Sequence, residues 1–356
     1  MPKTLDQPRF ELCGPGPRDI NKKGFSKTTG KSLRKVKQRL VEAWSITNWA
    51  IAVSYPEDVK TSPMKILLID GNNYTYRGFY AIKEELQNAD GIPTNAVRGF
   101  FTILHADLQV LKPTHLAVSF DRTPSYRRLE LYPEYKSTRT HNEGHEVKPQ
   151  MQIIRRLLRA MGIATLGIVG EETDDIIATL AMKMFQEEFN VLISSTDKDF
   201  AQLVNNRIKI VEARTRRLLG KREVQEKFGV KPSQIKDYLT LIGDSVDNVP
   251  GCKGIAGKTA AKLLNEYGDL NKIVKAAKRG ELTPALTKNI LHFKRSGQLD
   301  LSSRLIDLYT DVKLRFNVDR FDLAGRKIDH EKIENICDVL SMNNTEKLIW
   351  NINQWI

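Results

Sequence analysis

Acidic side chains recur along this sequence in a pattern that suits chemistry on divalent metal ions. The stretch GEETDDIIATLA, which starts at Gly170, places four acids within five positions, although the chain is basic overall. Further acids follow the apolar runs KILLI, LAVSF and VLISST, and two more lie in IGDSVDNVPG. Glu171 is better explained as a cap or a surface acid. The candidate metal ligands are Asp70, Asp121, Glu172, Asp174, Asp175, Asp197, Asp199, Asp244 and Asp247.

Carboxylates gathered in such numbers repel one another and raise each other's pKa unless cations neutralise them. A ligand set made only of oxygen favours Mg²⁺ or Mn²⁺. The acids exceed what one Mg²⁺ needs, and two ions ~3.5–4 Å apart suit in-line attack on a phosphodiester. A single acid could instead cap a helix or face solvent. Five separate segments that all deliver acids favour the metal interpretation.

The elements that must position these acids are short strands. KILLID, HLAVSF and NVLISS are apolar runs of strand length separated by helical patterns, and GIATLGIV and RIKIVEA could add two more strands. This spacing predicts an α/β fold with a mostly parallel central sheet flanked by helices. Ligands bind such sheets at the carboxyl ends of the strands, which is where the acids follow. Thr173 or Asp174 could cap the helix in the acidic stretch.

Helical patterns cover most of the remaining chain, and after Gly243 the strand patterns stop. The expected helices span residues 94–111, 149–161, 173–189, 233–242, 258–267, 282–294, 299–308 and 330–355. We therefore expect a basic, largely disordered extension (1–63), an α/β catalytic domain (64–243) and a helical C-terminal region (244–356).

Composition points to an anionic partner. The 356 residues carry a net charge of +13 and a pI of about 9.5, which favours nucleic acid first and a membrane surface second. No apolar run is long enough to span a bilayer. The three cysteines are far apart in sequence, so they indicate a reducing compartment and no disulfide framework.

Two segments carry basic groups suited to a nucleic acid. Residues 122–148 combine arginines and lysines with tyrosines, which could hold phosphates and stack on unpaired bases. A solvated charged loop is the alternative, and it suits Arg128 and Arg139 better than Arg127 and Lys136. Residues 244–268 fit a helix–hairpin–helix, whose helix N-terminus would face a phosphate. The candidate DNA-binding residues are Tyr126, Tyr135, Arg139, Gly251, Lys253, Gly254, Gly257, Lys258 and Lys262.

Five motifs in order resemble a known family. IDGNNYTYRGFYA, SFDRTPSYRRLELYPEYKSTR, VGEETDDIIATLA, LISSTDKDFAQLV and IGDSVDNVPGCKGIAGKTAAKLL are similar to the 5′-nuclease domain of bacterial DNA polymerase I. They also resemble its free-standing relatives, the phage flap endonucleases and 5′→3′ exonucleases. The resemblance runs from about Met64 to beyond Tyr309. It implies a PIN-like, Rossmann-like 5′-nuclease fold with a helical arch at about 122–148 and the helix–hairpin–helix.

The resemblance also implies roles for individual residues. Asp70, Asp121, Glu172, Asp174 and Asp175 would form the first metal site. The second, looser site would contain Asp197, Asp199, Asp244 and Asp247. Arg77, Arg127 and Lys136 would be the catalytic basic residues beside the scissile phosphate. Two or more Mg²⁺ ions are implied, with Mn²⁺ as a substitute and K⁺ at the hairpin.

The activity implied is hydrolysis of DNA near 5′ ends by a monomer. The substrates would be 5′ flaps, nicked or branched duplexes and RNA primer–DNA hybrids, in replication or repair. The alternatives are a branched-DNA-binding protein without turnover and a PIN-type ribonuclease. We expect a location in the cytoplasm of a bacterial cell or a phage-infected host. Targeting to an organelle by the N-terminal extension stays open.

Overall fold

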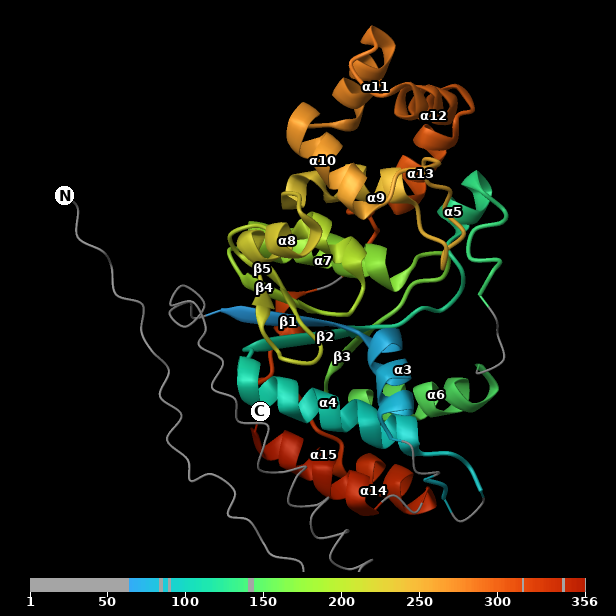
Figure 1. The fold of residues 1–356 in the computed structure, drawn as a ribbon. Coiled ribbons are helices and arrows are strands. Elements are labelled where there is room, and N and C mark those ends of the chain that lie inside the picture. The colour runs from blue at the N-terminus through green and yellow to red at the C-terminus, as the bar shows by residue number, and fades with distance from the viewer. Residues whose placement is uncertain are drawn as a thin grey trace, which may run out of the picture. The chain divides into compact units, whose positions relative to one another are not determined.

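Six strands form the central sheet of the computed structural model. They are β1 (Lys65–Asp70), β2 (His115–Ser119), β3 (Ala164–Leu166), β4 (Asn190–Ser194), β5 (Ile208–Val211) and β6 (Leu218–Leu219). Their order is β3-β2-β1-β4-β5-β6, and every pairing is parallel except β5 with β6 (Figure 1). The predicted, mostly parallel sheet is confirmed. The two-residue strand β6 was not predicted, because two leucines carry no readable periodicity.

The structure describes residues 64–82, 86–88, 91–139, 144–315, 317–340 and 343–355. The predicted N-terminal extension, 1–63, lies outside the described residues, and so do residues 140–143 of the predicted arch. All described residues fall within one compact unit, Val53–Ile356. No helix among them is long and apolar enough to cross a bilayer.

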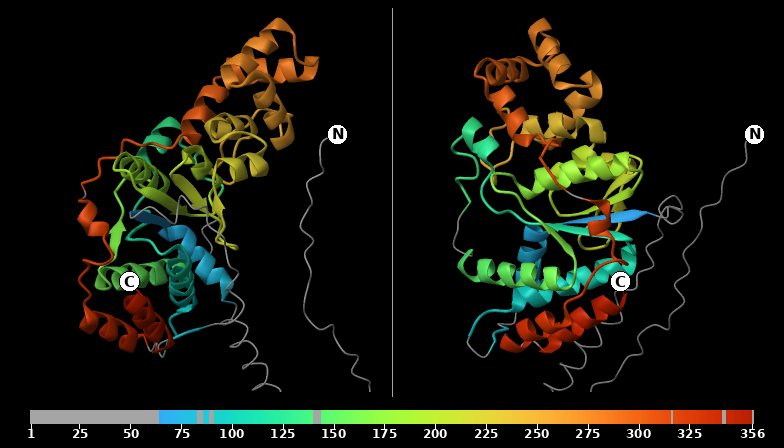
Figure 2. Two further views of the ribbon diagram at one scale, coloured as in Figure 1. Left: turned by 90° about the vertical axis from the view of Figure 1, so that its left-hand side faces the viewer. Right: turned by 180° about the vertical axis from the view of Figure 1, so that it is seen from behind.

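Helices cover both faces of the sheet. On one face lie α3 (Gly71–Ala81), α4 (Asn95–Leu111), α6 (Gly144–Ala160), α14 (His330–Val339) and α15 (Asn343–Trp355). On the other face lie α7 (Thr173–Gln186), α8 (Lys221–Phe228), α9 (Ile235–Ile242) and the 3-10 helices η1 (Lys198–Leu203) and η2 (Pro232–Gln234). Figures 1 and 2 show the two layers on either side of the strands.

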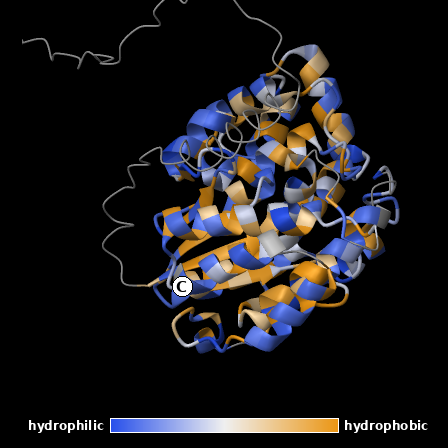
Figure 3. Ribbon diagram, turned by 90° about the horizontal axis from the view of Figure 1, so that it is seen from below, coloured by the Kyte–Doolittle hydropathy of each residue, from blue (hydrophilic) through white to orange (hydrophobic). Residues whose placement is uncertain are grey.

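The strand residues alternate between two hydrophobic cores. Ile66 and Leu68 of β1 pack into the core beneath α7, whereas Leu67 and Ile69 pack into the core beneath α4. All four side chains are buried, as expected for a parallel strand covered on both faces. Figure 3 shows the strands as largely hydrophobic between helices of mixed hydropathy.

The chain after Gly243 divides between two places. Helices α10 (Gly257–Tyr267), α11 (Leu270–Arg279), α12 (Pro284–Arg295) and α13 (Gln298–Ile306) follow α9. An extended segment and η3 (Val318–Phe321) then lead to α14 and α15, which contact α6 and α4. Residues 330–355, expected as one helix, form two helices. Part of the 244–356 region thus completes the core on the α4 face of the sheet.

Candidate active site

The predicted acids converge at the carboxyl edge of the parallel strands. Asp70 ends β1, Asp121 follows β2, Glu172 directly precedes α7, and Asp197 follows β4. The negative charges act on one another: Asp70 is influenced by Asp121 and Asp197. Within the same cluster, Asp174 is influenced by Asp70, Asp197 and Glu172. The structure therefore places these carboxylates, which come from separate segments, near one another at this edge.

The loop after α9 adds the remaining two acids. An isolated bridge joins Asp244 to Val249 and shapes the loop, with hydrogen bonds in both directions. Both Asp244 and Asp247 act electrostatically on Asp199, which lies in the first turn of η1. The second group of predicted acids is therefore also assembled at this edge.

Hydrogen bonds fix the first two carboxylates. Asp70 caps α3 by accepting from Asn73 N at 2.9 Å, and its other oxygen accepts from Ser195 Oγ at 3.0 Å. Asp121 accepts from Thr173 N at 2.7 Å, at the beginning of α7. The amide of Asn72 donates to the second oxygen of Asp121. Strands β1, β2 and β4 and helix α7 are thereby joined through the site.

The cluster holds more negative charge than its surroundings balance. Burial is the first cause, and neighbouring carboxylates add to it, so the pKa of Asp70 rises to about 7 and that of Asp199 to about 8. The same causes raise the pKa of Asp174 well above its ordinary value. Burial also raises the pKa of Asp121 and Asp197. A nearby cation would favour the charged forms that burial and repulsion disfavour here.

Two lysines neutralise part of the cluster. Lys136 Nζ lies 2.6 Å from Glu172 Oε1 and 3.8 Å from Asp247 Oδ2. Lys198 Nζ lies 2.6 Å from Asp244 Oδ2. Burial alone would raise the pKa of Glu172 and Asp244, but Lys136 and Arg128 lower the pKa of Glu172, and Lys198 lowers that of Asp244.

The donor set fits a hard divalent cation in its chemistry. Every predicted ligand is a carboxylate, and the side-chain carbonyl oxygens of Asn72 and Asn73 are buried beside it without a hydrogen-bond partner among the described residues. Within the described ranges, however, no three Asp, Glu, His or Cys side chains form a ready-made coordination sphere. The lysine contacts give a physical reason for this absence, because they hold Glu172 and Asp244 in ion pairs.

Asp175 is placed differently from its predicted role as a metal ligand. Both of its oxygens accept hydrogen bonds from Arg128, and Oδ1 also accepts from Tyr309 N at 3.0 Å. The Asp175 side chain is fully buried. One residue along a helix turns the side chain by about 100°, so Asp174 and Asp175 face different partners. Asp175 is a buried ion-pair residue, which corrects the prediction.

The two neighbouring arginines are placed differently from what was expected of them. Arg127 pairs with Glu171 at 3.2 Å and with Asp311 at 2.6 Å, and no predicted metal ligand is among its ion-pair partners. Arg128, expected to be solvated, is 2% exposed and lies 3.1 Å from Glu172. Adjacent residues in a helix point about 100° apart, so the two arginines meet different partners, and only the tertiary contacts show which of them is buried.

The arch-side turn, residues 132–139, is attached to the acidic loop. Lys136 N donates to Asp247 O at 3.0 Å, and the guanidinium of Arg139 pairs with the Asp247 carboxylate. Asn248 Nδ2 donates to Glu134 O at 2.8 Å. Lys136 has a φ of +59°, in the left-handed region that non-glycine residues rarely adopt. The predicted catalytic lysine is thus held at the cluster by its backbone as well as its charge.

The two tyrosines predicted to contact DNA, Tyr126 and Tyr135, differ in how far they are exposed. Tyr126 is 58% exposed at the beginning of α5 (Tyr126–Leu131), so its ring is free to meet a base. Tyr135 is 7% exposed, and its hydroxyl lies 3.3 Å from Glu172 Oε2 and 3.4 Å from Asp247 Oδ2. A buried ring cannot stack on a base, so the predicted DNA contact of Tyr135 is corrected to a hydrogen bond within the site.

Arg77 lies on α3, seven positions after the helix cap Asp70. Its Nη2 donates to Ala213 O at 3.1 Å, and its guanidinium lies 5.1 Å from the centre of the Tyr74 ring. Its Nη1 is buried without a hydrogen-bond partner among the described residues. Arg77 therefore has donor capacity left for an anion.

The predicted helix–hairpin–helix is formed by α9, a hairpin and α10. A Cβ on Gly251 would lie 2.3 Å from Ile242 O, and Gly254 has a φ of +76°, so both positions require glycine. A Cβ on Gly257 would meet Tyr238 OH at 2.5 Å. The lysines predicted to bind phosphate are all exposed: Lys253, Lys258 and Lys262.

A buried polar network beneath the site was missed in the sequence. Asp107, in the middle of α4, pairs with Arg216 at 2.7 Å and accepts hydrogen bonds from Tyr74 and Ser194. It joins α3, α4 and the end of β4 next to Ser195, which holds Asp70. The signal was one acid at a core position of an otherwise apolar helical stripe.

Comparisons with known proteins agree with this arrangement. Residues 65–229 match the family described as 5′-3′ exonuclease, N-terminal resolvase-like domain, and residues 230–330 match 5′-3′ exonuclease, C-terminal SAM fold. The chain is 35% identical over 287 residues to the 5′-3′ exonuclease of Aquifex aeolicus (strain VF5), covering 80% of this chain and 95% of that protein. The chain belongs to the 5′-3′ exonuclease family.

The relatives of this chain also include a larger enzyme. DNA polymerase I of Mycobacterium tuberculosis (strain ATCC 25618 / H37Rv) is 37% identical over 286 residues, which cover 78% of this chain but 30% of that polymerase. Among solved structures, the bacteriophage T5 flap endonuclease in a complex with DNA and metal ions has a TM-score of 0.56 at 20% identity. That match covers 82% of this chain and 99% of the phage protein.

A second structural relative is the catalytic core of Rad2 in complex with a DNA substrate. Its TM-score is 0.56 at 14% identity, and the match covers 86% of this chain and 99% of that chain. These likenesses confirm the predicted fold, with its mostly parallel sheet and helical C-terminal region.

Proposed function

We propose that this protein is a divalent-metal-dependent, structure-specific 5′ nuclease that acts on flapped, nicked or branched DNA and removes flaps and RNA primers in replication or repair. The observation that carries the proposal is the assembly of eight carboxylates from five segments at one sheet edge, next to a basic turn. Family membership supports the reaction class. The +13 net charge supports an anionic substrate.

Two groups of carboxylates would hold the ions, Mg²⁺ or Mn²⁺. The first contains Asp70, Asp121, Glu172 and Asp174. The second contains Asp197, Asp199, Asp244 and Asp247. Ions bound there would act as Lewis acids on the phosphodiester and on the attacking water. The raised pKa of Asp70 and Asp199 supports this proposal, because burial and then neighbouring carboxylates disfavour their charged forms, and a bound cation would favour those forms.

The basic side chains would orient the scissile phosphate. Lys136 and Arg139 stand beside the acids on one turn, and Arg77 has an unpartnered donor. Positive charge placed beforehand where charge develops in the transition state stabilises that state without reorganisation. The hairpin lysines would grip the duplex through its phosphates, without reading sequence.

The test is cleavage of a 5′-labelled flap duplex with Mg²⁺, with Mn²⁺ and with chelator. Wild-type protein should release a short 5′ product only when a divalent ion is present. Asp174→Asn should abolish cleavage and keep flap binding, whereas the matched surface variant Asp300→Asn should cut normally. Asp300 is an exposed residue paired with Lys294, away from the acids.

Two results would remove the proposal. Flap binding that no divalent ion converts to product would identify a binding protein without turnover. Cleavage of RNA hairpins in preference to DNA flaps would identify a ribonuclease.

A further inference from the structure

We propose that Arg128 is a positioning residue of the nuclease site, an inference that rests on the proposed function. It holds Glu172 at the acidic cluster and fastens the segment 305–309, which begins in the last turn of α13, to the base of the arch. Arg128 does not contact the substrate in this proposal. It acts through Glu172 and through the backbone of the segment 305–309.

The guanidinium of Arg128 has an acceptor for each of its nitrogens. Nε donates to Leu305 O at 2.9 Å, and Nη2 donates to Asp307 O at 2.7 Å. Nη1 and Nη2 together bind both oxygens of Asp175. Nη1 also lies 3.1 Å from Glu172 Oε2. A planar fork with five donors can make this set of contacts, and a lysine ammonium cannot.

Three parts of the chain meet at this one side chain. Arg128 belongs to α5, which begins the arch, and Glu172 and Asp175 belong to the beginning of α7. The third part is the segment 305–309, whose backbone supplies two carbonyl acceptors. Through Arg128, the position of Glu172 therefore depends on the positions of the arch base and of the segment 305–309.

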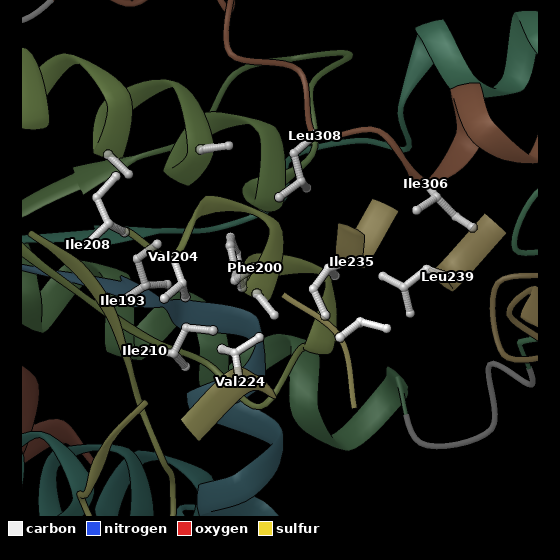
Figure 4. Close-up of a cluster of buried hydrophobic side chains, with 14 of the residues drawn as sticks. Ile193, Phe200, Val204, Ile208, Ile210, Val224, Ile235, Leu239, Ile306 and Leu308 are labelled. Atoms are coloured by element: carbon white, nitrogen blue, oxygen red, sulfur yellow. The ribbon is translucent and has the colours of Figure 1, made fainter. Parts of the chain in front are cut away.

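The segment is held from its other side as well. Tyr309 N donates to Asp175 Oδ1 at 3.0 Å, and Val312 N donates to Thr179 Oγ1 at 3.2 Å. Ile306 and Leu308 are buried in the core that contains Phe200, as Figure 4 shows. The apolar contacts fix where the segment runs, and Arg128 and Asp175 fix its register against α7.

Glu172 is held by one cation on each oxygen. Lys136 lies 2.6 Å from Oε1, and Arg128 lies 3.1 Å from Oε2. The Arg128 side chain is almost fully buried, whereas that of Lys136 is 21% exposed on the turn that faces the site. Lys136 is thus placed to meet a phosphate. Arg128 is placed to keep Glu172 oriented while Lys136 does so.

The experiment separates the contact with Glu172 from the ion pair with Asp175. Arg128→Met alone would leave Asp175 buried and unpaired, and it could fail to fold for that reason. The double variant Arg128→Met/Asp175→Asn removes both charges and keeps an amide oxygen for Tyr309 N. The single variant Asp175→Asn loses the same ion pair but keeps Arg128 on Glu172. Arg128→Lys keeps the charge without the fork, and Arg222→Met is a surface control.

We expect the double variant to lose at least tenfold in kcat on the flap, with less than a threefold change in KM. The Kd for Mn²⁺, measured by EPR without DNA, should rise at least threefold. Asp175→Asn and Arg222→Met should stay within threefold of wild type in kcat, and Arg128→Lys should not rescue. Hydrogen exchange at the amides of Tyr309 and Val312 should accelerate in the double variant.

Three outcomes would overturn the inference. An equal loss of kcat in Asp175→Asn and in the double variant would assign the effect to the ion pair alone. A tighter Mn²⁺ Kd in the double variant would make Arg128 a competing cation instead of a positioning residue. Unchanged exchange at Tyr309 would exclude the fastening role. If wild-type protein cuts no flap, the proposed function fails, and the exchange and EPR measurements still test Arg128.

Discussion

Lys198 forms an ion pair with Asp244, so this acid already has a positively charged partner within the protein. Its ammonium lies 2.6 Å from the carboxylate, and Asp199 and Asp197 also raise its pKa against the effect of burial. A divalent ion that binds Asp244 must compete with this lysine. Charge pairs in a partly exposed site are worth about 1 kcal/mol, and 1.4 kcal/mol is a factor of ten in affinity.

We therefore expect Lys198→Met to tighten Mn²⁺ binding by about three- to tenfold. An EPR titration at fixed pH and ionic strength measures the Kd. Lys221→Met is the matched control, because Lys221 bonds to Asn206 and no acid of the site. A weaker Kd for Lys198→Met would show that this lysine orders the site for metal instead of competing with it.

The acids of the site also predict how stability depends on pH. The pKa of Asp70 is about 7 and that of Asp199 about 8 in the folded protein, whereas an unfolded Asp titrates near ~3.9. The folded state therefore binds more protons between these values. The free energy of unfolding of the metal-free protein should fall as the pH rises from about 4 to about 8.

Thermal unfolding in chelator from pH 5.5 to 8.5 measures this effect. Asp199→Asn should raise the melting temperature at pH 8 and flatten its decline with pH, because the amide carries no charge. Asp300→Asn provides the control for an exposed aspartate. A steeper decline in Asp199→Asn would contradict the assignment.

At the scale of elements, α3 and α4 approach closely at two glycines. A Cβ on Gly99 would lie 2.4 Å from Gly78 Cα, and a Cβ on Gly78 would lie 2.6 Å from Phe100 N. Helix α3 begins at the cap formed by Asp70 and carries Asn72 and Asn73. Its distance from α4 therefore sets where the beginning of α3 stands in the site.

Gly99→Ala should push the two helices apart. Overpacking of this kind costs about 1–3 kcal/mol in the free energy of unfolding. Urea denaturation followed by circular dichroism measures the loss. Thr102→Ala, on an exposed position of α4, should change stability by less than ~0.5 kcal/mol. Equal stabilities of the two variants would mean that the helices can separate freely.

The strands and the acids that follow them could be predicted from the sequence, whereas the rotation of the helices could not. Strands buried on both faces are continuous apolar runs, and an acid after each run must lie at the carboxyl edge, so the sheet and the acidic edge were readable. Which way a helix is rotated was not readable, because packing decides it. Asp174 and Asp175, or Arg127 and Arg128, differ by one position, and only the tertiary contacts show which one faces the site.

Buried partners from distant parts of the chain were equally hidden. The acceptors of Arg128 include carbonyls of Leu305 and Asp307, nearly 180 positions away. The ring of Tyr135 looked like a base-stacking surface, because an amphipathic side chain in a polar stretch gives no sign of burial. Boundaries failed for a similar reason: residues 330–355 have one apolar pattern but contain two helices.

At the scale of the whole molecule, the excess of basic residues predicts strong salt dependence. DNA affinity should fall linearly on logarithmic axes as salt rises, with a slope set by the number of phosphates contacted. Lys253 is exposed on the hairpin between α9 and α10. Lys332 is exposed on α14, which packs on the other face of the sheet.

Lys253→Ala should reduce the slope for a nicked duplex by about 0.9, the value for one lost phosphate contact. Fluorescence anisotropy between about 50 and 200 mM salt, with Ca²⁺ in place of Mg²⁺, measures this slope. Lys332→Ala should leave the slope unchanged. A similar reduction in both variants would mean that binding follows total charge and not the hairpin.

The last two helices fill a core that the first strands need. Ile333, Ile336, Ile349 and Ile352 are buried in the same cluster as Leu104 of α4. During synthesis, α4 emerges from the ribosome more than two hundred positions before these side chains exist. A nascent chain therefore carries an exposed apolar face on α4 until α14 and α15 have been synthesised. Chaperones and proteases have their best opportunity in that interval, so truncations near the C-terminus should be degraded although every acid of the site is present.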